Sequence, residues 1–321
     1  MNNISETVAL SPPSAEGWDF GDYPYGLEPL TLPRADDPWG PEDDAAKADL
    51  QEVYREVLAA ERRHDLTTTP AAEADLERLF WFRWIIGHHI SFVVWRLLHR
   101  ALARLAAGEG DEQATAREIT EYVRGYSAML LYTGSSTREI YNETIRPSMY
   151  RLHSTFSGTW SSDYAAVRSV FRGRRVPRVV PSEVESLKKE IRLSHQIHLG
   201  VASKLVVGGR SLLQHLVDNP ATHQPRVWGA VFDCYFLTVR APISAYEVAA
   251  QLLRRCKAVV TDLATNGLWP APAEYPEGTP EELRTPEVLA CEKDMTDLLL
   301  RVAGLAVDLA GQGTRRVSAG R

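Results

Sequence analysis

Four histidines, in two pairs, are the residues of this sequence best suited to chemistry. His88 and His89 lie in the middle of its most apolar run, residues 79–104, and His195 and His198 lie three residues apart much later in the chain. A neutral imidazole is a common ligand of metal ions and haem iron, and its pKa lies close to neutral pH. The four side chains could therefore bind a metal or move protons.

Motifs that would direct these histidines to other metal chemistry are missing from the sequence. The spacing of His195 and His198 does not match the i, i+4 zinc pair, and neither a HExxH motif nor a carboxylate–histidine motif of di-iron proteins is present. The three cysteines are far apart, which indicates a reducing compartment without a disulfide framework or a zinc site. One histidine per helix, facing the other across a cavity, fits haem better. The alternative from composition and spacing is a helical scaffold in which the histidines are core residues.

The segments that carry the histidines are predicted to be long helices. The first runs from Ala71 to about Ala107, where Gly108 to Gly110 end it, and the second runs from Pro181 to about Val207. Because residues three apart share a helical face, both histidines of the second helix point the same way. Adjacent helical residues point about 100° apart, so we expect His89 to face away from a cavity that contains His88.

The remaining sequence predicts further helices and no strands. No run alternates convincingly between apolar and polar residues, and no repeat is present, so the predicted fold is all-α, a single domain of long helices. We divide the chain into an extended arm, residues 1–40, a haem-binding catalytic domain, 41–312, and a polar tail, 313–321. Pro147 is expected to interrupt one short helix. The other predicted helices are 41–63, 111–132, 137–145, 163–171, 226–240, 244–265 and 286–309.

Composition argues against two classes of partner. The formal charge is −6 and no long basic block appears, which excludes a general nucleic-acid binder. Residues 79–98 are long enough to span a membrane, but Arg83, the two histidines and Arg96 interrupt the run all round, so we expect no membrane helix. The N-terminus lacks the charged and apolar regions of a signal peptide, and we expect a cytoplasmic protein.

Three short segments resemble, in the same order, the tryptophan 2,3-dioxygenase-like haem-dependent aromatic oxygenases. The first is similar to the family's distal helix, where an aromatic residue precedes the distal histidine by four. The second is similar to its SGFQS substrate loop. The third is similar to its proximal helix and the glycine-rich loop that follows. In this sequence the segments are Trp84 to His89 with Trp95 to His99, Ser157 to Ser161 followed by Tyr164, and Arg192 to His195 with Gly208-Gly209.

Two departures from the family pattern indicate which branch of the family this sequence resembles most. The glycine-rich loop is reduced to Gly208-Gly209-Arg210-Ser211, and the arginine expected after the substrate loop is displaced, with Arg168 nearest. The sequence is therefore most similar to the haem-dependent L-tyrosine hydroxylases of antibiotic biosynthesis. That resemblance implies a histidine-ligated haem b that uses hydrogen peroxide to convert L-tyrosine to L-DOPA. A related branch attaches haem through a cysteine four residues after a histidine; Leu199 and Ala202 stand there, so covalent attachment is not expected.

The resemblance also implies roles for individual residues. His195 would bind the iron, because its spacing to the Gly-Gly pair fits the family; His198 is the alternative, because Ala202 leaves room for the porphyrin. His88 would be the distal acid–base group, with a pKa near working pH. Trp84, Gly208 and Gly209 would contact the cofactor. Residues expected at the substrate are His88, Trp160, Ser161, Tyr164, Arg168 and Arg210, the two arginines being equally suited to haem propionates or surface pairs.

Other readings stay open at this point. The oxidant is hydrogen peroxide or dioxygen, and the aromatic arm and the family indicate a homo-oligomer, a dimer or tetramer. A tryptophan-type dioxygenase or another aromatic amino-acid oxygenase is the first alternative activity. A cofactor-free helical interaction protein is the second.

Overall fold

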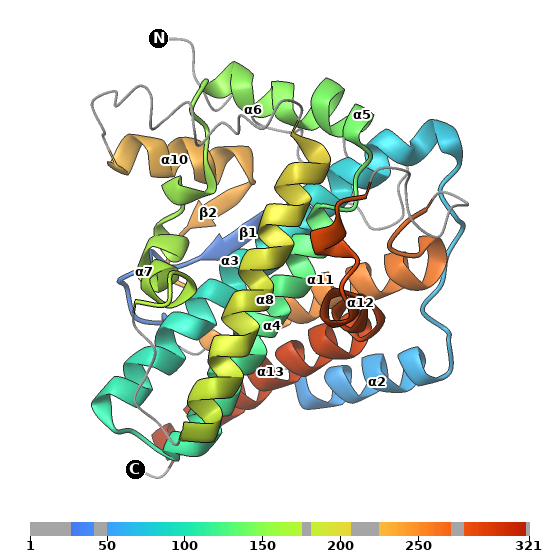
Figure 1. Ribbon diagram of the computed structural model, residues 1–321. Coiled ribbons are helices and arrows are strands. Elements are labelled where there is room, and N and C mark those ends of the chain that lie inside the picture. The colour runs from blue at the N-terminus through green and yellow to red at the C-terminus, as the bar shows by residue number, and fades with distance from the viewer. Residues whose placement is uncertain (1–26, 42–49, 175–180, 207–224, 271–278, 319–321) are drawn as a thin grey trace.

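The computed structural model describes residues 27–41, 50–174, 181–206, 225–270 and 279–318 (Figure 1). Helices make up most of these ranges, which confirms the all-α prediction. The Gly208-Gly209-Arg210 loop and most of the N-terminal arm lie outside the described residues. The helices are α2 Leu50–Arg62, α3 Leu76–Ala107, α4 Glu112–Thr133, α5 Arg138–Ile140, α6 Arg146–Leu152, α7 Ser162–Phe171, α8 Pro181–Leu205, α10 Pro225–Tyr235, α11 Ala245–Asn266, α12 Pro286–Lys293 and α13 Met295–Ser318.

Helix α3 is the centre of the fold, and its middle section is buried on nearly all sides. Helices α4, α7 and α11 pack against it. At Gly87 a Cβ atom would lie only 2.4 Å from Cγ2 of Thr133, so the glycine permits the close approach of α3 to the end of α4. An apolar helix without a polar face is stable only when protein surrounds it, as it does here.

The end of α4 also contacts α8. A Cβ atom on Gly134, the residue after Thr133, would lie 2.6 Å from both Cγ atoms of Val201. Two consecutive residues at the end of α4 thus touch α3 beside His88 and α8 one turn after His198. The two histidine-bearing helices are held by the same short stretch of chain.

A buried ion pair fixes α3 to α11. The Nε and Nη2 atoms of Arg83 donate to the two carboxylate oxygens of Asp262, at 2.8 and 3.0 Å, and both side chains are almost fully buried. The Tyr132 hydroxyl donates to the same carboxylate at 2.6 Å, and Arg83 also donates to the carbonyls of Gly267 and Leu268. A buried charge is tolerated only when it is paired and hydrogen-bonded in this way.

The last turn of α8 is hydrogen-bonded to the segment that follows α4 and to α5. The Nζ atom of Lys204 donates to the carbonyls of Gly134 and Ser136, both at 2.9 Å, and lies 4.2 Å from the Trp269 ring centroid. Burial lowers the pKa of Lys204 to about 7. Helix ends leave carbonyls without intrahelical partners; Arg138 donates to the Lys204 carbonyl at 2.8 Å.

Pro147 does not interrupt its helix, and that prediction was wrong. A π turn, Tyr141–Ile145, connects α5 to α6, and the Arg146 amide donates to the Tyr141 carbonyl five residues back. Pro147 then occupies the first turn of α6. A first-turn residue needs no N–H donor, so the ring is accommodated there without loss of a hydrogen bond.

Two short strands and one helix break were also missed. The predicted helix 226–240 ends at Tyr235, and the chain enters β2, Thr238–Arg240, which pairs in parallel with β1, Leu30–Leu32. Three residues are too few for alternation to be visible in a sequence. The predicted helix 286–309 is divided at Asp294 into α12 and α13. No helix of the described ranges is both long and apolar enough to cross a membrane.

Candidate active site

His88 lies on α3 in contact with two aromatic rings. Its ring centroid is 4.3 Å from that of Trp84 and 4.3 Å from that of Phe236, and the Phe236 ring is stacked on it with an interplanar angle of 19°. Its Nδ1 atom is 2.6 Å from the Trp84 carbonyl oxygen. A carbonyl only accepts, so Nδ1 carries the hydrogen and Nε2 keeps its lone pair. No side chain or backbone group in the described part of the chain bonds Nε2.

The surroundings of His88 correct one expectation about its acidity. Burial lowers the pKa of His88 to about 4, and the hydrogen bond to Trp84 only partly offsets this. Desolvation disfavours the charged form of an imidazole. His88 is therefore neutral at pH 7, with Nε2 as a proton acceptor, and its pKa is not near working pH as the sequence suggested.

His89 points to a different side of α3. It is fully buried; its Nε2 atom is hydrogen-bonded to the Phe236 carbonyl, and its Nδ1 atom is 3.3 Å from Nε of Arg255 on α11. Burial holds the pKa of His89 well below its ordinary value, and the Arg255 charge acts in the same direction. Both ring nitrogens of His89 are hydrogen-bonded, so His89 has a structural role and offers no free nitrogen beside His88.

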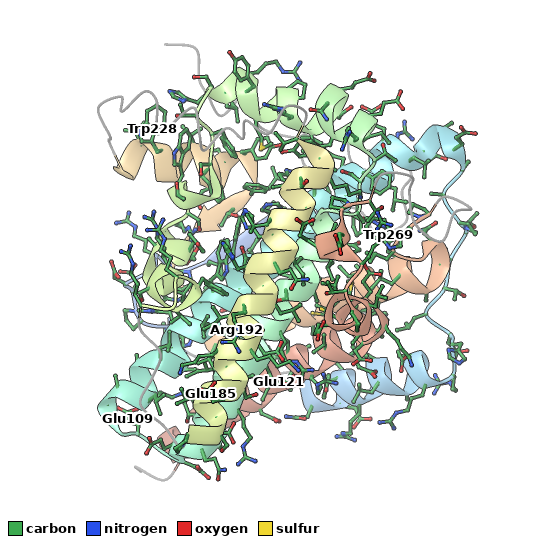
Figure 2. All side chains as sticks on the ribbon, in the orientation of Figure 1. Glu109, Glu121, Glu185, Arg192, Trp228 and Trp269 are labelled. Atoms are coloured by element: carbon green, nitrogen blue, oxygen red, sulfur yellow. The ribbon has the colours of Figure 1, made fainter. Side chains whose placement is uncertain are left out.

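Trp160, predicted to lie at the substrate, belongs to the aromatic cluster that surrounds His88. It ends the 3₁₀ turn Gly158–Trp160, and its ring is 5.3 Å from Phe156, whose ring is 6.2 Å from Phe236. On its other side Trp160 contacts Trp228 of α10, labelled in Figure 2, at 4.7 Å. The predicted substrate loop and the predicted distal histidine are thus joined by contacting rings.

Tyr164 approaches the same helix from α7. Its ring is 5.1 Å from that of Trp95, two turns after His88 on α3. Burial raises the pKa of Tyr164, whereas the nearby charges of Arg168 and Arg172 lower it. Nε of Arg168 is buried and has no hydrogen-bond partner among the described residues. An arginine near a buried phenol, with a donor to spare, suits a substrate carboxylate or a propionate.

Ser161 has a structural task in addition to any contact with substrate. Its Oγ accepts a hydrogen bond from the Tyr164 amide at 3.3 Å and so caps the first turn of α7. A serine is among the preferred residues at this position because it satisfies an amide that the helix cannot. The cap fixes the orientation of Tyr164 relative to the loop that carries Trp160.

His195 and His198 both lie exposed on one side of α8, as their spacing predicted. The opposite side is occupied: Gln196 donates to the Glu282 carbonyl and to Oγ1 of Thr285, both at 2.8 Å. Burial lowers the pKa of His198, and His195 adds to the effect.

The structure brings the two histidine helices together through α4 and leaves their imidazoles unconnected. No hydrogen bond or ring contact joins His88 to His195 or His198 in the described ranges. In Figure 1, α7 and α10 lie to the left of α8 and α12 lies to its right. Gln196 faces the segment that leads into α12, and both histidines of α8 are exposed.

These residues fit haem by the chemistry of their donors. Neither imidazole of α8 has a hydrogen-bond partner in the part of the chain that the structure describes, so either is free to coordinate iron. His88 offers an unbonded Nε2 in apolar surroundings, as a distal residue requires. The flat aromatic rings of Trp84 and Phe236 beside it suit a porphyrin edge or an aromatic substrate.

Several members of this site were not found from the sequence. Phe236, Phe156 and Trp228 complete the cluster, and Arg255 binds His89, but none lies in a motif. The one available signal was the aromatic pair Tyr235-Phe236 inside the predicted helix 226–240. Its role could not be inferred because it depends on the return of the chain to α3.

Part of the chain is similar to known proteins. Residues 40–192 match the model of a peroxygenase family, and this range contains His88, Trp160, Tyr164 and Arg168 and ends before His195. The family is described as SfmD 3-methyl-L-tyrosine peroxygenase. A stretch of 72 residues is 39% identical to 3-methyl-L-tyrosine peroxygenase of Streptomyces lavendulae and covers 21% of this chain.

The aligned part spans only 20% of that relative's length. The resemblance drawn from the sequence is nonetheless confirmed at the level of the class, because the matched family is one of tyrosine-type peroxygenases. The match extends from α2 into α8, so it includes the whole of α3 and the 3₁₀ turn Gly158–Trp160.

Proposed function

We propose that this protein is a haem-dependent peroxygenase that hydroxylates L-tyrosine ortho to the phenol, with hydrogen peroxide as oxidant. The balanced reaction is L-tyrosine plus hydrogen peroxide to L-DOPA plus water. The observation that carries the proposal is the state of His88: one ring nitrogen is bonded to the Trp84 carbonyl, the other is open, and the rings of Trp84 and Phe236 lie against it. The family match over residues 40–192 supports the same class of reaction.

The cofactor proposed is haem b, held by His195, with His198 as the alternative ligand. When bound, haem supplies an iron that activates hydrogen peroxide for transfer of one oxygen atom to an aromatic ring. Burial lowers the pKa of His198 and so favours the neutral imidazole, which is the form that binds iron. Leu199 and Ala202, four residues after the two histidines, offer no thiol, so the haem is expected to be non-covalent.

His88 is proposed as the acid–base residue. Its Nε2 accepts a proton from hydrogen peroxide and returns it to the oxygen atom that leaves as water. A positioned group of this kind contributes about 10²–10⁴-fold to the rate. Because the pKa of His88 is about 4, its protonated form is a strong acid that gives the proton back readily.

The substrate is proposed to lie against Trp160 and Tyr164. An aromatic side chain fits beside these rings, and the open Nε donor of Arg168 suits the carboxylate of an amino acid. Arg210, the second candidate, lies outside the described residues. A second candidate substrate is 3-methyl-L-tyrosine, which the name of the matched relative contains.

Two experiments test the proposal. Haem is added to the purified protein and the Soret absorption is recorded, with and without tyrosine. The protein is then given L-tyrosine, 3-methyl-L-tyrosine or tryptophan, each with hydrogen peroxide or with dioxygen, and the products are identified. Absence of a Soret band would favour the cofactor-free helical protein, and oxidation of tryptophan with dioxygen would favour the dioxygenase.

Variants separate the roles of the histidines. His88→Ala is expected to keep the Soret band and to lose about 10²–10⁴-fold in turnover. His99→Ala, on the same helix and partly exposed, is the matched control and should retain turnover. His195→Ala and His198→Ala are compared by spectrum: the variant whose Soret band changes identifies the ligand, and full turnover in His88→Ala would contradict the acid–base role.

A further inference from the structure

The position of Phe236 over His88 is determined by groups on the other side of α3. Phe236 is the first residue after α10, and the chain turns sharply there, with Leu237 in the left-handed region at φ 50°. The Leu237 amide donates to the Cys234 carbonyl, and its carbonyl accepts from the Leu30 amide of β1. The turn is therefore held at both ends, but these bonds do not reach α3.

His89 makes the bond that connects this turn to α3. Its Nε2 atom is hydrogen-bonded to the carbonyl oxygen of Phe236, the residue whose ring is stacked on His88. His88 and His89 are consecutive, so one histidine holds the backbone of Phe236 while the other receives its ring. The Phe236 side chain is 1% exposed and has little freedom to move independently.

Arg255 determines which nitrogen of His89 carries the hydrogen. A guanidinium can only donate, and Nε of Arg255 is directed at Nδ1 of His89 at 3.3 Å. Nδ1 must then be unprotonated, and Nε2 must carry the hydrogen that is donated to the Phe236 carbonyl. In His88 the arrangement is reversed, because Nδ1 is bonded to the Trp84 carbonyl.

Arg255 is itself firmly placed. Its Nη1 atom donates to the Gln251 carbonyl at 3.1 Å, and its Nη2 atom donates to the carbonyls of Glu28 and Pro29, at 3.0 and 3.1 Å. The side chain is 2% exposed. It therefore joins the segment that enters β1 to His89, and through His89 to the ring that covers His88.

We propose that Arg255 and His89 are positioning residues for His88: they hold Phe236 against its imidazole, while the Trp84 carbonyl leaves Nε2 as the nitrogen that exchanges protons. The two adjacent histidines are fixed in opposite tautomers, His88 as the Nδ1–H form and His89 as the Nε2–H form. The catalytic meaning of this arrangement rests on the proposed function of His88, but the arrangement itself does not require haem or substrate.

The first test measures the tautomers in the wild-type protein and uses variants only to assign the signals. Long-range ¹H–¹⁵N spectra of the full-length chain at pH 7 report the tautomer of each histidine, and spectra of His88→Gln and His89→Gln assign the signals. The expected result is an Nδ1–H form for His88 and an Nε2–H form for His89. The same tautomer at both positions, or a charged His89, would overturn the proposal.

The second test uses two neighbouring arginines. Arg254 and Arg255 both contact the Glu28 carboxylate, at 3.1 and 3.4 Å, but only Arg255 reaches His89. Arg255→Gln is expected to mix the tautomers of His89, whereas Arg254→Gln should leave the spectrum unchanged. Equal effects of the two variants would contradict the proposal, as would an unchanged His89 signal in a folded Arg255→Gln protein. If Arg255→Gln does not fold, the wild-type spectrum of the first test decides.

The third test asks whether His89 acts through Phe236. Ring protons of His88 stacked on Phe236 are shifted upfield, and this shift is expected to be lost in His89→Leu. His89→Gln is expected to keep it, because an amide can accept from Arg255 and donate to the Phe236 carbonyl. A folded His89→Leu protein with unchanged His88 signals would show that the stacking needs no such support. A missing Soret band would refute the proposed function and leave all three results interpretable.

Discussion

The buried imidazole of His88 should make the stability of this protein depend on pH in a way that one substitution removes. Burial lowers the pKa of His88 from 6.5 in an unfolded chain to about 4 in the folded one. Between these values the unfolded state binds a proton that the native state does not. Stability therefore rises with pH in this window, is complete above about pH 6.5, and is lost as the pH falls.

The size of the effect follows from the two pKa values. Between pH 7.5 and pH 4.5 the linkage expression gives a loss of about 2.5 kcal/mol from His88 alone. His88→Gln has no proton to gain and should lose about 2.5 kcal/mol less than the wild type over the same interval. Buried groups that do not interact with His88 contribute equally to both proteins and cancel in the difference.

The assay is urea unfolding followed by circular dichroism, with the free energy of unfolding extrapolated at both pH values. Tyr150→Phe, at an exposed position on α6, controls for substitution as such and should follow the wild type. A difference between wild type and His88→Gln below about 0.5 kcal/mol, within the error of such extrapolations, would refute the reasoning. It would mean that water reaches His88 in the folded protein.

Three further outcomes are expected. Gly87→Ala should destabilise the protein by about 1–3 kcal/mol in urea unfolding, because the added Cβ would lie 2.4 Å from Cγ2 of Thr133. Alanine normally favours a helix over glycine, so a stabilised variant would contradict this contact. Asp262→Ala should cost about 3–5 kcal/mol, since it removes the carboxylate that neutralises the buried Arg83 guanidinium, and thermal melting measures the loss; a change below about 1 kcal/mol would show that water reaches the pair. Trp160→Ala should raise KM for the aromatic substrate more than it lowers kcat, as measured by steady-state kinetics with varied tyrosine. A larger effect on kcat than on KM would contradict contact between this ring and the substrate.

Periodicity was sufficient to find the long helices of this fold. The apolar run around His88 could only be a buried helix, and the three-residue spacing of His195 and His198 placed both on one side of α8. Where glycine or a capping residue marked a helix end, the predicted end lay close to the observed one. Helix α3 ends before Gly108, which adopts a left-handed conformation, and Ser244 caps α11 with a full capping box.

Features that depend on contacts distant in sequence could not be found in this way. Pro147 was taken as a helix break because the π turn that accommodates it is not visible in a residue pattern. The pKa of His88 was taken from free imidazole, whereas the aromatic rings that lower it come from both α3 and the end of α10. Phe236 reaches His88 only after the chain has passed through several other helices, and no local signal encodes that return.

The parallel pairing of β1 with β2 bears on the order in which the protein can be completed during synthesis. Leu30 is made early, but its partner Thr238 leaves the ribosome more than two hundred residues later. Until then the backbone groups of β1 have no strand to bind, and the imidazole of His88 has no Phe236 to cover it. The apolar run of α3 must wait, partly exposed, for the last third of the chain, so a chaperone that shields nascent apolar segments should raise the yield of folded protein.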